Sequence, residues 1–149
     1  MKPTYLDWAA TAPPMQDILA KAATVAIDHF ANPSSIHSAG ADARRVIEES
    51  RQVCADEINA DPGHVYFTSG GSEGNNIILT SILTRKAKGS LVVSGIEHAS
   101  VYEPARLIGK SGFEVRYVSA EKSGRISADR FAAKIAGDTV MASIMLVNN

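Results

Sequence analysis

The sequence predicts an α/β fold, in which an N-terminal helical segment precedes a βαβαβαβ run that forms a mostly parallel sheet. Three observations carry this prediction. Apolar residues recur at helical spacing over the first 60 residues. From residue 64 onward, short β-branched runs alternate with helix-like stretches. The connections between them are short, which is typical of parallel strands joined by crossover helices.

Two helices are predicted in residues 1–60. Pro13 and Pro14 open the first, and the polar segment 32–35 ends it. The second runs from Ser38 to Asn59, with Arg44/Glu48 and Arg45/Glu49 as expected ion pairs. The expected buried faces are Ile18, Ala22, Val25 and His29 in the first helix, and Ala43, Val46, Ile47, Ser50, Val53, Cys54 and Ile58 in the second. Cys54 is therefore expected to be a core thiol.

The α/β part is predicted to span 64–149, with strands at 65–68, 91–94, 113–118 and 140–147. Helices are predicted at 73–86, with Ile77, Ile78, Ile82 and Leu83 facing inward, at 100–110, and after Ser127, which is a good helix cap. The last strand has no covering helix after it, and an apolar edge strand is a feature that domains usually avoid. We therefore expect 1–149 to be the N-terminal portion of a larger unit.

Composition excludes several classes of protein. The 149 residues are 45% hydrophobic and 21% charged with a net charge of −1, which is typical of a globular domain and gives no basic excess for nucleic acid or anionic membranes. A single cysteine excludes an internal disulfide framework. No apolar signal core opens the chain and no run is long enough to span a bilayer, so a cytoplasmic location is predicted.

The strongest candidate site is the segment 68–73, Thr-Ser-Gly-Gly-Ser-Glu, between a predicted strand and a predicted helix. Glycines allow close approach of a ligand, and a helix N-terminus presents N–H groups and a positive dipole end. The segment has neither the Walker pattern nor the dinucleotide pattern. The alternative is a tight turn capped by Ser72.

Three further segments carry polar groups. His98 follows a predicted strand and would stack on a flat cofactor or move a proton, or else it caps a helix. The amides of 148–149 end another strand, and the loop 32–37 would line a site or form a capped turn between helices. No cluster has the spacing of metal ligands.

These segments together resemble the cysteine desulfurases, in the class V aminotransferase branch of the fold-type I pyridoxal-phosphate (PLP) enzymes. The matching stretches occur in the family's order: 5–13 (YLDWAATAP), 32–37 (NPSSIH), 67–73 (FTSGGSE), 96–98 (IEH) and 145–149 (MLVNN). Trp8, Ala12, Ser72 and 74–76 depart from the family's common residues. The resemblance implies that the sheet belongs to the large domain of a PLP-dependent transferase.

Residue by residue, the resemblance implies that Gly71 and Ser72 bind the cofactor phosphate. His98 would lie over the pyridine ring and act in proton transfer, and Asn149 would hydrogen-bond the phenolic oxygen. The segments 32–37 and 9–11 would line the substrate side. No metal is implied.

The resemblance also implies an activity: a homodimeric enzyme removes sulfur from L-cysteine, leaving alanine and an enzyme persulfide for a sulfur-acceptor protein in iron–sulfur cluster assembly. The Schiff-base lysine and the nucleophilic cysteine of the family are expected beyond Asn149, so the chain alone is expected to be inactive. The alternatives are a selenocysteine lyase or another class V aminotransferase, and a non-catalytic module that binds phosphate ligands or a partner.

Overall fold

The computed structural model describes residues 3–85 and 87–148. The chain divides into two compact units between Phe67 and Thr68, which we call the helical unit and the sheet unit. The assignment of 1–60 and 64–149 to two parts of a transferase stays a prediction. Each unit is described below by itself.

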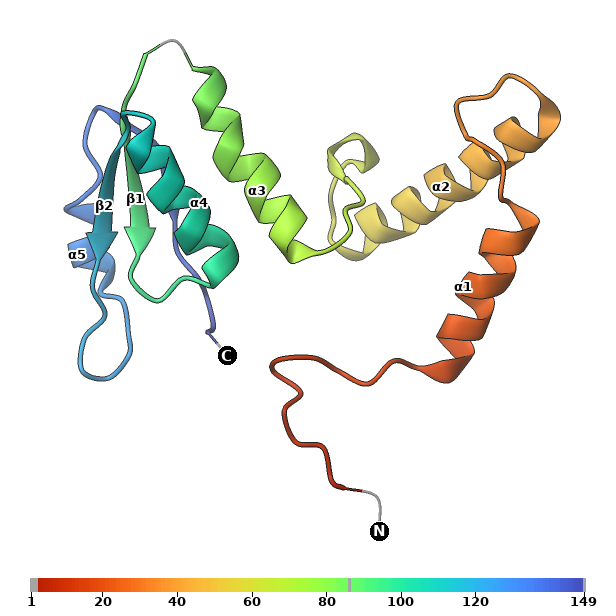
Figure 1. Ribbon diagram of the computed structural model, residues 1–149, viewed down its shortest axis with the longest axis horizontal. Coiled ribbons are helices and arrows are strands. Elements are labelled where there is room, and N and C mark those ends of the chain that lie inside the picture. The colour runs from red at the N-terminus through yellow and green to blue at the C-terminus, as the bar shows by residue number, and fades with distance from the viewer. Residues whose placement is uncertain (1–2, 86, 149) are drawn as a thin grey trace. The chain divides into compact units, whose positions relative to one another are not determined.

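The sheet unit has parallel strands in the order β2-β1-β3, as Figure 1 shows. Its elements are α3 (Gly71–Ser81), the 3₁₀ turn η2 (Ile82–Thr84), β1 (Ser90–Ser94), α4 (Ala99–Lys110), β2 (Glu114–Val118), α5 (Ala128–Ala132) and β3 (Thr139–Ser143). The register pairs Ser90 with Glu114 on one side and, beyond an irregularity, Leu91 with Met141 on the other. The α/β class and the parallel sheet are therefore confirmed.

Helices cover both faces of β1, which is the central strand and is buried over its whole length. Leu91 and Val93 face α3 and α4, where they pack with Leu79, Ile82, Val101, Ala105, Ile108 and Phe113. Val92 points to the opposite face of the sheet and packs with Val118 of β2 and Phe131 of α5. Alternation along one strand thus supplies both cores, because successive side chains point to opposite faces.

The predicted strand at 65–68 is wrong, because these residues form no strand in the structure. Tyr66 and Phe67 are 78% and 53% exposed. A strand needs a neighbour to accept its backbone hydrogen bonds, and among the described residues none pairs with this segment. The βαβαβαβ run is therefore seen as a three-stranded sheet that starts at Ser90.

Two element ends and one helix face also differ from the predictions. The last strand ends at Ser143 instead of 147, because β1, its only described ladder partner, ends at Ser94. The helix at 73–86 tightens into η2 at Ile82, and Lys86 lies outside the described residues. Its inward residues are Leu79 and Ile82, whereas Ile77, Ile78 and Leu83 are 56%, 61% and 40% exposed.

The helical unit consists of α1 (Gln16–Asp28), α2 (Ser38–Glu57) and the 3₁₀ turn η1 (Pro62–His64). Both long helices form where they were predicted. Their expected buried faces are mostly wrong: of those residues Ala43 is buried, Val46 and Ile47 are half-buried, and Ser50, Val53, Cys54 and Ile58 are exposed. Helix α1 buries no residue, and α2 buries only Gly40, Ala43 and Ala55. Among the described residues of this unit nothing covers the apolar stripe. Cys54 is accordingly exposed instead of a core thiol.

Arginine side chains of α2 hold the loops on both sides of the helix. Arg44 donates to the carbonyl oxygens of Pro33 and Ser35, at 2.7 and 3.3 Å, instead of pairing with Glu48. The predicted Arg45–Glu49 pair is present at 2.8 Å. Arg51 pairs with Glu48 and donates to the carbonyl oxygen of Val65, which holds the chain after η1 against the helix.

Candidate functional site

The segment 68–73 forms the first turn of α3 and the loop before it. The helix begins at Gly71, and its N-cap residue, Gly70, supplies no side-chain cap. A side chain placed on Gly70 or Gly71 would meet no atom within 4 Å, so this helix end faces open space within the sheet unit. The N–H groups of a first helical turn have no partner inside the helix and carry the positive dipole end. The geometry therefore suits an anion.

Glu73 belongs to this segment, and no role was predicted for its side chain. Its carboxylate accepts a hydrogen bond from the Ser69 N–H, at 2.5 Å. Hydrogen bonds from the backbone and side chain of Ser69 lower the pKa of Glu73. The carboxylate therefore occupies one donor of the segment, and an anion bound at Gly71 and Ser72 would lie near a negative charge.

His98 is the N-cap residue of α4, as the alternative reading of its position predicted. Its Nδ1 atom accepts a hydrogen bond from the Ser100 N–H at 3.1 Å and lies 2.8 Å from the Ser100 hydroxyl oxygen. The side-chain amide of Asn75, on α3, donates to that same hydroxyl oxygen at 2.9 Å. The helix that carries Gly71 and Ser72 is thus linked to His98 by one chain of hydrogen bonds.

Neither Asn75 nor Ser100 was a candidate in the sequence analysis. They lie 25 positions apart on two helices. No short motif joins them, so only the packing of α3 against α4 reveals the contact. The capping position of His98, by contrast, followed from its place just before a predicted helix.

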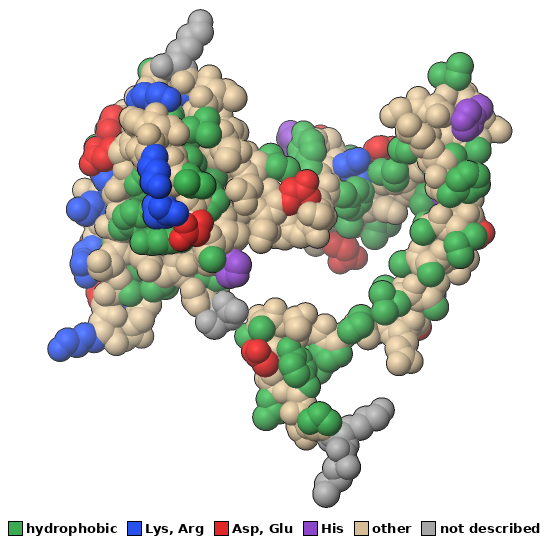
Figure 2. All heavy atoms as spheres, in the orientation of Figure 1, with side chains coloured by type: hydrophobic (Ala, Val, Ile, Leu, Met, Phe, Trp, Pro, Cys, Tyr) green, Lys and Arg blue, Asp and Glu red, His purple; other side chains and the backbone are tan. Residues whose placement is uncertain are grey.

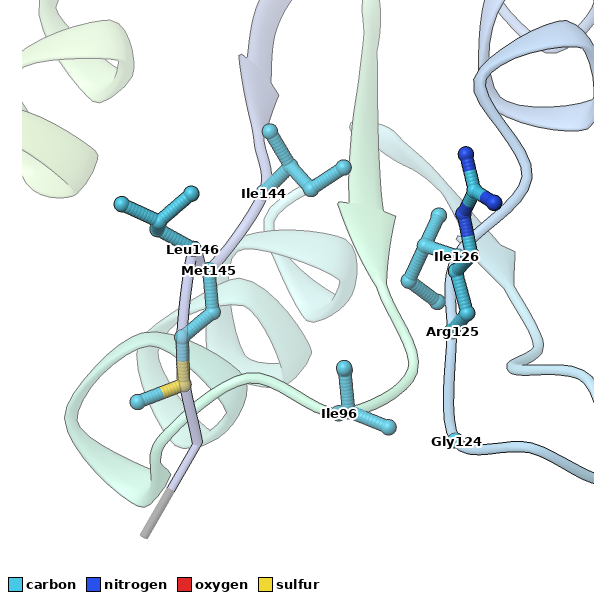
Figure 3. A pocket seen from close by; sticks show the side chains of 7 residues that line it. All are labelled: Ile96, Gly124, Arg125, Ile126, Ile144, Met145 and Leu146. Atoms are coloured by element: carbon cyan, nitrogen blue, oxygen red, sulfur yellow. The ribbon is translucent and has the colours of Figure 1, made fainter.

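The carboxyl edge of the sheet contains a cavity of about 300 Å³ (Figure 3). It is formed by segments that follow all three strands, which is where parallel sheets bind ligands. Its lining is mainly aliphatic: Ile96, Gly124, Arg125, Ile126, Ile144, Met145 and Leu146. Gly71, Ser72 and His98 do not line it.

Two asparagines follow β3, and the structure describes only the first of them, Asn148. The side chain of Asn148 donates to the carbonyl oxygen of Ile96, which ties this segment to the turn after β1. Asn149 lies outside the described residues, so its contact with a cofactor stays a prediction.

The loop 32–37 belongs to the helical unit and forms a capped turn. The Ser35 N–H donates to the carbonyl oxygen of Asn32, and the Ser34 N–H donates to the Asn32 side chain, at 3.0 and 2.9 Å. His37 caps α2 by accepting from the Gly40 N–H. This is the local structure that the alternative interpretation predicted. A place for 32–37 and 9–11 beside a substrate stays a prediction.

Residues 3–85 and 87–148 have neither a metal-binding cluster nor a membrane-spanning helix. No group of three or more His, Cys, Asp and Glu side chains there is arranged to hold a metal ion. No helix of this part is both long enough and apolar enough to cross a membrane. The cytoplasmic location stays a prediction.

The comparisons with known proteins define the class to which this α/β fold belongs. The profile of the family described as aminotransferase class-V matches residues 4–149, and the chain belongs to that family. Class V aminotransferases are in general PLP-dependent enzymes.

The most similar relatives include proteins named as cysteine desulfurases. The chain is 40% identical over 147 residues to cysteine desulfurase IscS 1 of Archaeoglobus fulgidus, covering 97% of this chain and 38% of that protein. It is 36% identical over 148 residues to cysteine desulfurase IscS of Dictyoglomus turgidum, covering 97% and 37%. The chain therefore spans somewhat over a third of the length of these curated relatives, and the resemblance noted in the sequence is confirmed.

Solved structures are similar in fold as well. A structure titled NifS-like protein superposes with a TM-score of 0.87 at 28% identity, covering 93% of this chain and 39% of that one. One titled SspA in complex with cysteine gives 0.86 at 34% identity, covering 94% and 41%. DndA from Streptomyces lividans gives 0.80 at 36% identity, covering 98% and 42%.

Proposed function

We propose that this chain provides the phosphate-binding part of the PLP site in a cysteine desulfurase, which converts L-cysteine to alanine and an enzyme-bound persulfide. The observation that carries the proposal is the uncapped first turn of α3, at Gly71 and Ser72, joined by hydrogen bonds to the N-cap residue of α4, His98. The similar proteins named as desulfurases favour this reaction over the alternatives.

The residues present fit the phosphate group of PLP. Backbone N–H groups at a helix N-terminus and an adjacent hydroxyl, that of Ser72, are the donors that phosphate prefers. The space in front of Gly70 and Gly71 leaves room for the group. The negative charge of the Glu73 carboxylate repels the phosphate dianion. Phosphate binding therefore depends on the hydrogen-bond donors of Gly71 and Ser72.

The residues have separate parts in this proposal. Gly71 and Ser72 hold the phosphate, His98 faces the ring and serves in proton transfer, and Asn149 contacts the phenolic oxygen. When bound, PLP supplies an electron sink that stabilises negative charge developing on the substrate carbon. The covalent lysine and the sulfur-accepting cysteine are assigned to sequence beyond this chain, and Cys54 is not given that part.

The whole protein is proposed to act as a homodimer that passes sulfur to an acceptor protein for iron–sulfur cluster assembly. Support for this comes from the family resemblance. A selenocysteine lyase or another class V aminotransferase would use the same phosphate site. The reaction therefore has to be tested on a complete enzyme.

A chimaera tests the proposal directly. Residues 4–149 replace the matching segment of the Dictyoglomus turgidum desulfurase, and PLP affinity and alanine release from L-cysteine are measured. We expect both to be retained. Ser72→Ala should weaken PLP binding roughly ten- to a hundredfold, because a hydrogen bond to a charged group contributes roughly 1.5–3 kcal/mol.

The matched control is Ser81→Ala, in the last turn of the same helix, where the hydroxyl bonds only to the carbonyl oxygen of Ile78. It should leave PLP affinity unchanged. A chimaera that folds and binds PLP but releases no alanine would refute the desulfurase assignment. Equal effects of the two substitutions would refute the role of Ser72.

A further inference from the structure

We infer that Asn75 and Ser100 are positioning residues that hold His98 as the neutral tautomer with its proton on Nε2. The inference goes beyond the proposed function, since it concerns the state of the imidazole ring before any cofactor binds. It rests on the hydrogen-bond chain that connects α3 to the N-cap residue of α4.

The Ser100 backbone N–H favours one of the two neutral tautomers, and the side chains of Ser100 and Asn75 add to that preference. The Ser100 N–H lies 3.1 Å from Nδ1 of His98, and a backbone N–H can only donate. Nδ1 must therefore present its lone pair. In a neutral imidazole the other nitrogen, Nε2, then carries the proton.

The Ser100 hydroxyl adds a second donor to the same lone pair. Its oxygen lies 2.8 Å from Nδ1, a distance at which two lone pairs would repel, so the hydroxyl proton lies between the two atoms. The hydroxyl oxygen must then accept its other hydrogen bond. Asn75 provides it through its amide Nδ2, 2.9 Å away. Every donor in the chain thus points toward His98.

Packing keeps this chain in place. Asn75 and Ser100 are half-buried, and their helices share the core residues Leu79, Val101 and Ala105. The nearest carboxylate in sequence, Glu97, is turned toward β1, where it accepts from the Ser94 hydroxyl at 2.6 Å. Since His98 itself is exposed, its Nε2–H is left as a donor to a ligand atom that accepts a hydrogen bond, such as a phenolate or thiolate.

The test is the protonation of the ring nitrogens in the ¹⁵N-labelled chain, measured by NMR without cofactor. His98 is assigned by loss of its signals in His98→Gln. We expect an unprotonated Nδ1 and a protonated Nε2. Asn75→Asp should weaken the preference for the Nε2 tautomer, because a carboxylate has no proton to donate and takes that of the Ser100 hydroxyl. Nδ1 then keeps only the Ser100 backbone N–H as a donor, and the fraction of rings that carry the proton on Nδ1 should rise. The Nδ1 resonance should then shift toward that of a protonated nitrogen.

Three controls make the result decisive. Asn76→Asp introduces the same charge one position away, at a side chain that donates to the carbonyl oxygen of Ser72, and should leave Nδ1 unprotonated. Ser100→Thr keeps the hydroxyl and should behave as the wild type. Adding Ser100→Ala to Asn75→Asp should abolish the Nδ1 shift, because the connecting hydroxyl is gone.

A protonated Nδ1 in the wild-type chain would overturn the inference, even if no variant folds. So would an Asn75→Asp variant that is folded by circular dichroism and leaves Nδ1 unchanged. Solid-state spectra give the same readout if the chain self-associates. Because PLP is absent throughout, the outcome is independent of the test of the proposed function.

Discussion

Arg116 is the residue whose contacts have the clearest consequence for stability. From β2 its guanidinium donates to both carboxylate oxygens of Asp138, at 3.1 and 3.0 Å, and to both of Glu114, at 2.9 and 2.7 Å. These hydrogen bonds lower the pKa of both carboxyl groups below their ordinary values of 3.8 and 4.5. Arg116 thereby ties β2 to the turn before β3.

The lowered pKa values give a pH dependence with a definite sign. A carboxyl group whose pKa is lower in the folded chain stabilises the fold above its unfolded pKa, and loses that contribution as the pH falls through its folded pKa. We therefore expect Arg116→Gln to cost stability at pH 7 and to flatten the loss of stability between pH 5 and pH 3. Urea unfolding at each pH measures both effects.

Arg106→Gln is the matched control, since Arg106 pairs with Glu103 within one exposed turn of α4 and joins no two elements of the fold. Its acid profile should follow that of the wild type. If Arg116→Gln also follows the wild type, the ion pairs of Arg116 contribute nothing to acid sensitivity.

At the scale of elements, the close contact between α2 and the loop before it requires a glycine at position 40. A Cβ on Gly40 would lie 2.6 Å from the carbonyl oxygen of Ser35 and 2.8 Å from that of Asn32. The backbone atoms of a closed turn cannot move away without a substantial cost in free energy. Gly40→Ala should therefore destabilise the chain by roughly 1–3 kcal/mol, although alanine is the better helix former.

Urea unfolding again measures the change. Gly137→Ala is the control, because a Cβ there would meet no atom within 4 Å, and it should cost no stability. An Ala variant at position 40 as stable as the wild type would show that the loop 32–37 is not held by this close approach.

For the molecule as a whole, exposed apolar surface is the dominant feature. Figure 2 shows hydrophobic side chains over much of the visible surface. In α1, Ile18, Leu19 and Ile27 are 51%, 54% and 73% exposed. Large apolar patches drive association. We expect the chain to sediment as a dimer or a larger species at micromolar concentration.

Charged substitutions on α1 test the source of association. Leu19→Glu with Ile27→Glu should shift the chain toward smaller species, whereas Lys21→Glu, on the same helix, should change little. A compact monomer with a sharp cooperative melt would contradict the prediction, and would favour a stand-alone module over a portion of a larger enzyme.

Patterns along the chain were enough to predict the class of fold, the family and the segment at 68–73 that opens α3. Periodicity locates α4, β1 and β2 because their side chains have partners within the chain. The motif order indicates the desulfurases, because each short motif alone is weak evidence whereas five of them in the family's order are specific. The cap at Ser127 also follows from local chemistry, and its hydroxyl accepts from the Arg130 N–H.

Which apolar faces are covered could not be predicted from patterns along the chain. The stripes of α1 and α2 have the periodicity of buried surfaces, yet Val53 and Ile58 are exposed because burial requires a partner that periodicity does not reveal. The same reason removes the predicted strand at 65–68, which has no described neighbour to pair with. The contact of Asn75 with Ser100 also needed the structure, because it arises where two helices meet on one face of the sheet, and no spacing along the chain records that meeting.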